Sequence, residues 1–148
     1  MSKKNKLSRS KQRHNARCHA MQALYQWQMN PVTSGELLLH FYQDNDLTGC
    51  DETYFQTLVK GVVSSHDEID TLMSAKMDRD IDDLNPVELA VLRLSIFELR
   101  ECMDVPYKVV INEALNIAKE FGSVEGYKYV NAILDKLSPT LREAEFHR

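Results

Sequence analysis

The sequence predicts an all-α fold, a compact bundle of six or seven helices, and three observations support this prediction. Only 5 Gly and 4 Pro interrupt the 148 residues, so the segments between these helix-breaking residues are long. Apolar residues recur within the segments at the three- and four-residue spacing of an amphipathic helix. No segment shows the strict alternation of apolar and polar residues that is typical of a strand. The chain length fits one domain with one hydrophobic core.

The first half of the chain is expected to form three helices, over residues 11–30, 34–43 and 51–76. Pro31 ends the first of these, because proline disfavours helical geometry in the residue before it. The third is expected to bend near residues 64–65. Each helix carries apolar residues on one side, and we expect these sides to form the core. The expected core residues are Ala16, Ala20, Ala23, Leu24 and Trp27 in the first helix, Leu37, Leu38 and Phe41 in the second, and Tyr54, Phe55, Leu58, Val59, Val62, Ile69, Leu72 and Met73 in the third.

An acidic stretch at residues 78–83 has no long apolar repeat and is expected to connect two helical halves, which meet near residues 77–85. Asn85 and Pro86 predict the start of the next helix, since Asn is a favoured N-cap and Pro suits the first helical position. Glu88 stands where a capping box places a glutamate. This helix is expected to reach about residue 102. Its expected core residues are Leu89, Leu92, Ile96 and Leu99.

Pro and Gly residues delimit the last two predicted helices. We expect the first of them to begin at Pro106 and to stop at Gly122, because a glycine commonly follows a helix C-terminus. Ser123 is expected to cap the final helix, which should end at residue 137 because Pro139 follows it. The core residues expected in these helices are Val109, Ile111, Ala114, Leu115 and Ala118, then Tyr127, Val130, Leu134 and Leu137.

Charge is divided unevenly along the chain. Residues 1–35 carry seven Lys and Arg side chains and no acid, and the first acidic residue is Glu36. Clustered Lys and Arg bind phosphate locally even when the net charge of the chain is −4. We therefore expect residues 1–10 to form a flexible basic arm and residues 11–148 to form a single helical domain. From charge alone, a disordered solubilising tail is an equally good interpretation of the arm.

The chain is expected to be cytoplasmic. The basic N-terminal residues are not followed by the apolar stretch of a signal peptide, and no apolar run approaches the roughly 20 residues that span a bilayer. Cys18, Cys50 and Cys102 are odd in number and far apart, which favours reduced thiols over a disulfide framework. The sequence therefore predicts no contact with a membrane.

One acidic spacing resembles a calcium loop but lacks essential positions. Asp78, Asp80 and Asp82 follow the first ligand spacings of such a loop, but Asp83 stands where the loop needs Gly. Leu89 stands where the loop needs a bidentate Glu. The sequence therefore predicts a solvated acidic connector rather than a metal site.

His14, Cys18 and His19 lie close together in the first helix, but a structural zinc site needs four ligands and the other cysteines have no CxxC partners. The sequence contains no Gly-rich nucleotide-binding loop and no motif of a serine hydrolase or a zinc protease. We therefore expect no metal, no cofactor and no enzymatic activity.

The strongest functional pattern combines cations with aromatic residues. Arg13 and Arg17 precede Tyr25 in the first helix, and Lys128 precedes Tyr129 in the last. Arginine contacts phosphates and stacks on bases, while an exposed ring offers its face to an unstacked base. This combination is typical of single-stranded RNA binding. A tyrosine beside an apolar stripe is also commonly a partly buried core residue, so both interpretations stay open for the two tyrosines.

Several blocks of sequence carry a resemblance to a known family. The blocks lie at residues 16–17, 20–27, 86–94, 104–114, 121–122 and 129–136. The most specific motifs are DVPYKVVINEA and KYVNAILDK, of which the second begins at residue 128. These blocks resemble the NusB family, and together they span nearly the whole chain. The resemblance implies two roughly perpendicular three-helix bundles, with the halves meeting near the acidic connector.

The resemblance also implies a function. Proteins of the NusB family pair with NusE, a ribosomal protein of the small subunit, and the pair binds boxA RNA. With other Nus factors they help RNA polymerase to read through terminators, notably in ribosomal RNA operons. Transferred to this chain, the RNA surface of the family falls on Arg13, Arg17, Tyr25, Lys128 and Tyr129. His14 lies in the same basic patch with a charge that depends on pH, and Glu88 is the residue expected to contact NusE.

Two alternatives belong to other classes of protein. A NusB-like domain also precedes the catalytic domain of certain RNA cytosine methyltransferases, but 148 residues leave no room for that second domain. A small helical DNA-binding regulator is the other alternative, since it too would be helical and locally basic. Its basic residues would have to lie on a recognition helix, whereas here they gather in the arm and the first helix.

Overall fold

The computed structural model describes residues 7–147, so the first six residues of the expected arm lie outside the described part of the chain. The described residues form helices and no strands, which confirms the all-α prediction. The α-helices are α1 (Arg9–Met29), α2 (Ser34–Asp44), α3 (Glu52–Ser74), α4 (Pro86–Glu101), α5 (Tyr107–Phe121), α6 (Gly126–Leu141) and the short α7 (Glu143–Phe146), with a 3₁₀ helix, η2 (Ile81–Asp83), in the connector. None of the helices in this range is both long and apolar enough to cross a membrane.

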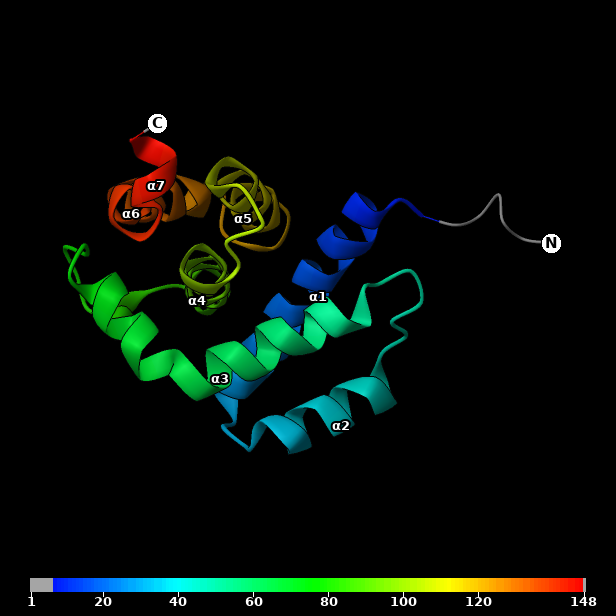
Figure 1. Cartoon of the computed structure of the whole chain (residues 1–148). Helices are drawn as coiled ribbons and strands as arrows, with labels where there is room; N and C mark the ends of the chain where they lie inside the picture. Colours follow the sequence, from blue (N-terminus) through cyan, green and yellow to red (C-terminus); the bar gives the residue numbers. More distant parts are fainter. Residues whose placement is uncertain (1–6, 148) are drawn as a thin grey trace.

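The helices are arranged as two sets of three. Figure 1 shows α1, α2 and α3 from the side, whereas α4, α5 and α6 are seen along their axes. The two sets therefore lie roughly perpendicular to each other, as the resemblance implies. The connector that contains η2 leads from α3 to α4, close to the place where the sequence predicts that the halves meet.

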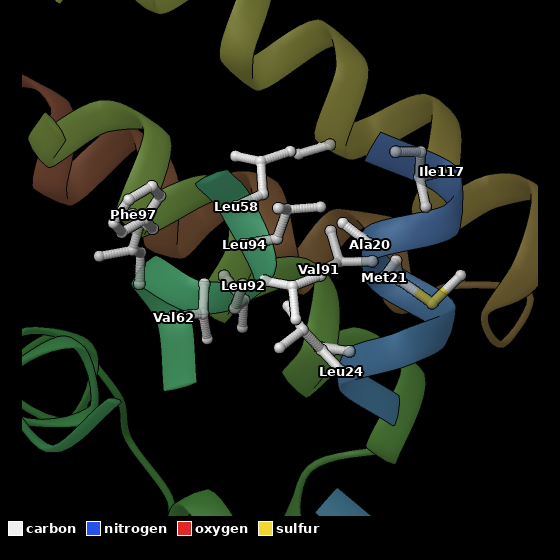
Figure 2. Packing of buried hydrophobic residues seen from close by; sticks show 14 of the residues in the cluster. Ala20, Met21, Leu24, Leu58, Val62, Val91, Leu92, Leu94, Phe97 and Ile117 are labelled. Carbon is white, nitrogen blue, oxygen red and sulfur yellow. The ribbon is translucent and has the colours of Figure 1, made fainter. Parts of the chain in front are cut away.

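Helix α4 is the part of the core that both sets share. It contacts α1 and α3 of the first set and α5 and α6 of the second. Every residue from 90 to 99 is buried, so this helix has no solvent-facing side over that length. Figure 2 shows Val91 and Leu92 of α4 packed between Leu24 of α1 and Val62 of α3. One apolar stripe was expected on this helix, but tertiary packing buries all of its sides.

The first helix starts earlier than predicted, and two other local predictions are confirmed. Ser8 caps α1 by accepting a hydrogen bond from the backbone N–H of Lys11, so the helix starts at Arg9 and includes the last two residues of the expected arm. Ser65 has non-helical backbone angles inside α3, where the bend is expected. Asn85 caps α4 by accepting hydrogen bonds from the backbone N–H groups of Val87 and Glu88. Capping therefore places the helix starts that position the candidate site.

The start of α6 differs from its prediction. Ser123 does not cap the helix, which begins at Gly126 after the N-cap residue Glu125 and continues past the expected end at residue 137, through Pro139, to Leu141. The cause at the start is Glu88, which accepts hydrogen bonds from the backbone N–H and the hydroxyl of Ser123. Glu88 therefore does not close a capping box in its own helix. Pro139 is tolerated because it lies in the last turn on an exposed position, where water can satisfy the carbonyl that it leaves free.

One core prediction in α5 is wrong. Val109 is 42% exposed, while Val110 is fully buried. The buried side of α5 is formed by Val110, Ile111, Ala114, Ile117 and Ala118, so it contains three of the five expected residues. Tyr127 and Leu115, also expected in the core, are only partly buried against it.

The C-terminal end of α4 is closed by a side chain that no sequence pattern indicates. Arg142 is 3% exposed and reaches α4 from the end of α6. Its guanidinium donates hydrogen bonds to the carbonyl oxygens of Glu98 (3.1 Å), Leu99 (2.6 Å), Cys102 (2.9 Å) and Val105 (2.7 Å). The last carbonyls of a helix lack N–H partners within it. The carbonyls of Glu98 and Cys102 each also accept a backbone N–H, from Cys102 and Val105, so Arg142 is a second donor to these two and the donor to Leu99 and Val105.

Candidate nucleic-acid interface

Arg17 of α1 lies in the interior, although the sequence resemblance places it on the RNA surface. The residue is 4% exposed, and its Nε donates to both carboxylate oxygens of Glu98 at 3.0 Å. Tyr54 donates its hydroxyl to the same carboxylate. Burial alone would lower the pKa of Arg17, but the hydrogen bonds and the charge of Glu98 outweigh burial and raise that pKa. The structure therefore gives Arg17 an internal partner and leaves it almost no surface for phosphate.

Arg13 lies at the edge of the same cluster and keeps some exposure. Its guanidinium stacks over the ring of Tyr54 at 4.2 Å, and it approaches Asp51 at 3.7 Å and Asp104 at 3.5 Å. The Arg13 side chain is 21% exposed and that of Asp104 is 69% exposed. Ion pairs of this kind are weak because solvent screens them. Arg13 can therefore exchange a carboxylate for a phosphate more easily than Arg17 can.

His14 faces α5 and is held by an acid. Its Nδ1 lies 2.8 Å from Oε1 of Glu113, and its Nε2 lies 3.5 Å from Sγ of Cys18. Burial raises the pKa of the Cys18 thiol to about 11, so this cysteine is a neutral thiol at physiological pH. His19 points elsewhere, with its ring edge-on to Phe41 at 5.8 Å. Among residues 7–147, no three His, Cys, Asp or Glu side chains are placed to hold a metal ion.

Tyr25 lies on the same side of α1 as His14, because eleven residues return to within about 20° of the starting direction around a helix. It is 37% exposed, so it is not a core residue. The ring borders an apolar surface hollow of about 370 Å³ between α1, the start of α4 and the end of α5. The hollow is lined by Met21, Gln22, Tyr25, Gln26, Val87 and Phe121. A shallow apolar hollow beside an exposed ring can accommodate an unstacked base.

Lys128 and Tyr129 line a second hollow, of about 520 Å³, between the connector, the start of α4 and the start of α6. Lys128 is 62% exposed and pairs with Glu125 one turn before it. Tyr129 is partly buried against the core. Its hydroxyl donates to Asp78 at 3.2 Å, and the guanidinium of Arg79 covers its ring at 4.2 Å. The two residues therefore share one site with the connector.

The two hollows adjoin each other. In α4, Val87 lines the first hollow and the next residue, Glu88, lines the second. Likewise, Phe121 at the end of α5 lines the first hollow and Ser123 in the α5–α6 turn lines the second. We call the surface that runs from Tyr25 across this turn to Tyr129 the aromatic strip. The structure thus places Lys128 and Tyr129 in one hollow and Tyr25, about a hundred residues earlier in the chain, in the neighbouring hollow. Arg17 instead pairs with Glu98 in the interior.

Glu88 anchors the turn in the middle of the aromatic strip. It is 6% exposed, and its carboxylate accepts the hydrogen bonds from Ser123 described above. Gly126 permits this contact, because a Cβ at that position would lie 2.0 Å from Oε2 of Glu88. A Cβ at Gly122 would lie 2.4 Å from the same oxygen. Gly122 has ordinary negative φ, so close approach rather than a left-handed backbone explains this glycine. A contact of Glu88 with NusE stays a prediction.

Two residues of the aromatic strip were not predicted from the sequence. Phe121 completes the hollow beside Tyr25, and Arg79 covers Tyr129. Phe121 lies in a block that resembles the NusB family, which is a usable signal for its importance. Arg79 lies in the connector, where its acidic neighbours obscure the single cation.

Three comparisons place the chain among known proteins. The sequence profile of the NusB family matches residues 14–139. The transcription antitermination protein NusB of Pseudomonas fluorescens is 52% identical over 95% of this chain and 84% of its own length. The protein of the same name from Coxiella burnetii is 52% identical over 90% of this chain and 97% of its own length.

Solved structures also show similarity to NusB proteins. The NusB chain in a crystal structure of the antitermination factors NusB and NusE in complex with double-stranded RNA superposes with a TM-score of 0.75. That match covers 86% of this chain and 96% of the other, with 25% identity. NusB of T. maritima matches with a TM-score of 0.69 and 28% identity, over 91% of this chain and 96% of the other. The chain therefore belongs to the NusB family.

Proposed function

We propose that this protein is a transcription antitermination factor that pairs with NusE and binds boxA RNA in the nascent transcript. It acts in the cytoplasm, within the RNA polymerase antitermination complex that contains other Nus factors. One observation carries the proposal: about half of its residues are identical to those of proteins named transcription antitermination protein NusB, over nearly the whole chain. The related crystal structure that holds NusB, NusE and RNA together supports the same partners.

The aromatic strip supports binding of unstacked bases. Tyr25 and Tyr129 offer rings at its two ends. Apolar and amide side chains line the hollow beside Tyr25, while the hollow beside Tyr129 has both cations and carboxylates in its lining. Base stacking on such rings tolerates many sequences, so hydrogen-bonding groups along the strip would add any preference for boxA. The rival hypothesis of a DNA-binding regulator has no such support, because Arg17 is buried and the relatives named above are antitermination proteins.

Phosphate contacts are assigned to the cations that remain at the surface. Arg9 and Lys11 are exposed in the first turn of α1, and Lys128 is exposed at the far end of the strip. The seven cations before the first acid were all candidates in the sequence. Of those in α1, Arg17 is committed to Glu98, which leaves the first turn and Arg13 as the positions from which phosphate is reached.

A titration of labelled boxA RNA with and without saturating NusE tests the proposed function. We expect NusE to tighten binding, because the acidic body of this chain repels phosphate and a basic partner surface would offset that repulsion. A scrambled RNA of equal length, a double-stranded RNA and a DNA duplex at the same salt concentration serve as controls. Equal RNA affinity with and without NusE, or equal affinity for boxA RNA and duplex DNA, would contradict the proposed function.

Replacing Tyr25 with Ala is expected to weaken boxA binding by roughly 5- to 150-fold, which corresponds to about 1–3 kcal/mol of base stacking. Stability should change little, because the ring is 37% exposed and lies outside the core. The measurements are RNA affinity and urea unfolding of the same variant. Leu39→Ala is the matched control, since Leu39 is 57% exposed on α2, away from the strip. A large decrease in stability with normal RNA affinity would show that Tyr25 has a structural role and does not stack on RNA.

A further inference from the structure

Three side chains at the junction of the connector and α6 form a closed cluster. Asp78 accepts hydrogen bonds from the hydroxyl of Tyr129 at 3.2 Å and from Nε of Arg79 at 3.3 Å. The guanidinium of Arg79 stacks on the ring of Tyr129 at 4.2 Å. The hydrogen bonds from Arg79 and then from Tyr129 lower the pKa of the Asp78 carboxyl, so Asp78 is charged at neutral pH. Each member therefore holds the other two.

Arg79 covers the side of the Tyr129 ring that RNA would use. Tyr129 is partly buried against the core, so one side of the ring is turned inward. Arg79 is on the solvent side, because its own side chain is 48% exposed. A guanidinium stacked at 4.2 Å leaves no space for a base on that face. RNA and Arg79 therefore compete for the same surface of Tyr129.

An RNA base can displace Arg79 from the ring of Tyr129. An exposed cation–π contact shifts an equilibrium by roughly two- to fivefold, whereas a stacked base contributes roughly 5- to 150-fold. A base therefore displaces Arg79, but the net gain from stacking is reduced by the free energy needed to open the cluster. The apparent affinity falls in proportion to the fraction of molecules in which the ring is free.

We propose that Asp78 and Arg79 set the RNA affinity of the aromatic strip, by holding the ring of Tyr129 until an RNA base displaces Arg79 from it. This inference rests on the proposed function, because it takes RNA as the competing ligand. The role of Asp78 is to position Arg79 and the hydroxyl of Tyr129, and it makes no contact with RNA. The connector between the two halves thereby becomes part of the binding site.

Two substitutions open the cluster without removing the ring. Asp78→Ala removes the acceptor that holds both partners, and Tyr129→Phe removes only the hydroxyl. We expect Asp78→Ala to tighten binding of labelled boxA RNA by about two- to fivefold, the scale of the cation–π contact that is opened. Tyr129→Phe should tighten it by less, because the phenyl ring and the Arg79–Asp78 hydrogen bond remain. The double variant should bind no more tightly than the better single variant, because both changes break the same hydrogen bond.

Asp82→Ala is the matched control for charge. Asp82 is an exposed acid of the same connector, and it lines the hollow on the Trp27 side rather than the one that contains Tyr129. Removing either acid reduces repulsion of phosphate to a similar extent, so the cluster accounts for any further gain in Asp78→Ala. An equal gain in the two variants overturns the proposal. Weaker binding by Tyr129→Phe also overturns it, since the hydroxyl would then contact RNA directly.

Tyr129→Ala separates this inference from the proposed function. If the wild-type protein binds boxA RNA and Tyr129→Ala binds it at least fivefold more weakly, the ring is in the site, and the two opening variants decide on the cluster. If Tyr129→Ala binds normally, the cluster proposal fails while the proposed function stands. If the wild-type protein with NusE does not bind boxA RNA, the proposed function fails first. Urea unfolding of every variant corrects each affinity for the folded fraction.

Discussion

Replacing Arg17 with Met is expected to lower the free energy of unfolding by about 3–5 kcal/mol, because the change leaves the Glu98 carboxylate buried without its cation. Glu98 is 1% exposed, so water cannot take the place of the guanidinium. Urea unfolding followed by circular dichroism measures the decrease. Adding Glu98→Gln to the same variant should restore much of the stability, since a neutral amide still accepts the hydroxyl hydrogen bond of Tyr54. A single variant as stable as the wild type would contradict the buried ion pair.

The RNA affinity of the Arg17 variant separates the internal role from a phosphate contact. We expect its salt dependence to match that of the wild type once binding is corrected for the folded fraction. Replacing Arg9 and Lys11 together provides the comparison, since both are exposed in the first turn of α1. Removing one cation that binds a phosphate of single-stranded RNA lowers the slope of log affinity against log salt by about 0.7. A decrease of that size in the Arg17 variant would restore Arg17 to the RNA surface.

Replacing Arg142 with Met is expected to cost about 3–5 kcal/mol of stability, because the change removes the donor shared by four carbonyl oxygens at the end of α4. Arg142→Lys should be less destabilising, since an ammonium keeps three donors but cannot reproduce the planar guanidinium geometry. The matched control is Lys136→Met, an exposed position of α6, for which a change within about 0.5 kcal/mol is expected. Equal urea midpoints for the Arg142 and Lys136 variants would show that the carbonyls find other partners.

Helix periodicity and caps predicted most of the fold because they are local properties of the chain. The apolar stripe that contains Ala16, Ala20 and Leu24 is buried as expected, and Asn85 caps its helix as expected. Local signals could not show which sides of a helix meet other helices. For this reason the burial of every residue from 90 to 99 of α4 and the exposure of Val109 were not predicted. Both depend on the crossing of the two helix sets.

For the candidate site, too, local patterns predicted some features and the tertiary structure decided others. Sequence pattern and family resemblance by themselves predicted Tyr25, Lys128 and Tyr129 as site residues, and the structure places Tyr25 in one hollow and Lys128 and Tyr129 in the next. Only the tertiary structure showed which site residues already have partners, because the partners come from distant parts of the chain. Arg17 meets Glu98, which lies 81 residues away, and Tyr129 meets Asp78, which lies 51 residues away. An acid at such a distance leaves no trace in the local pattern around a basic residue, yet it decides whether that residue is free to bind phosphate.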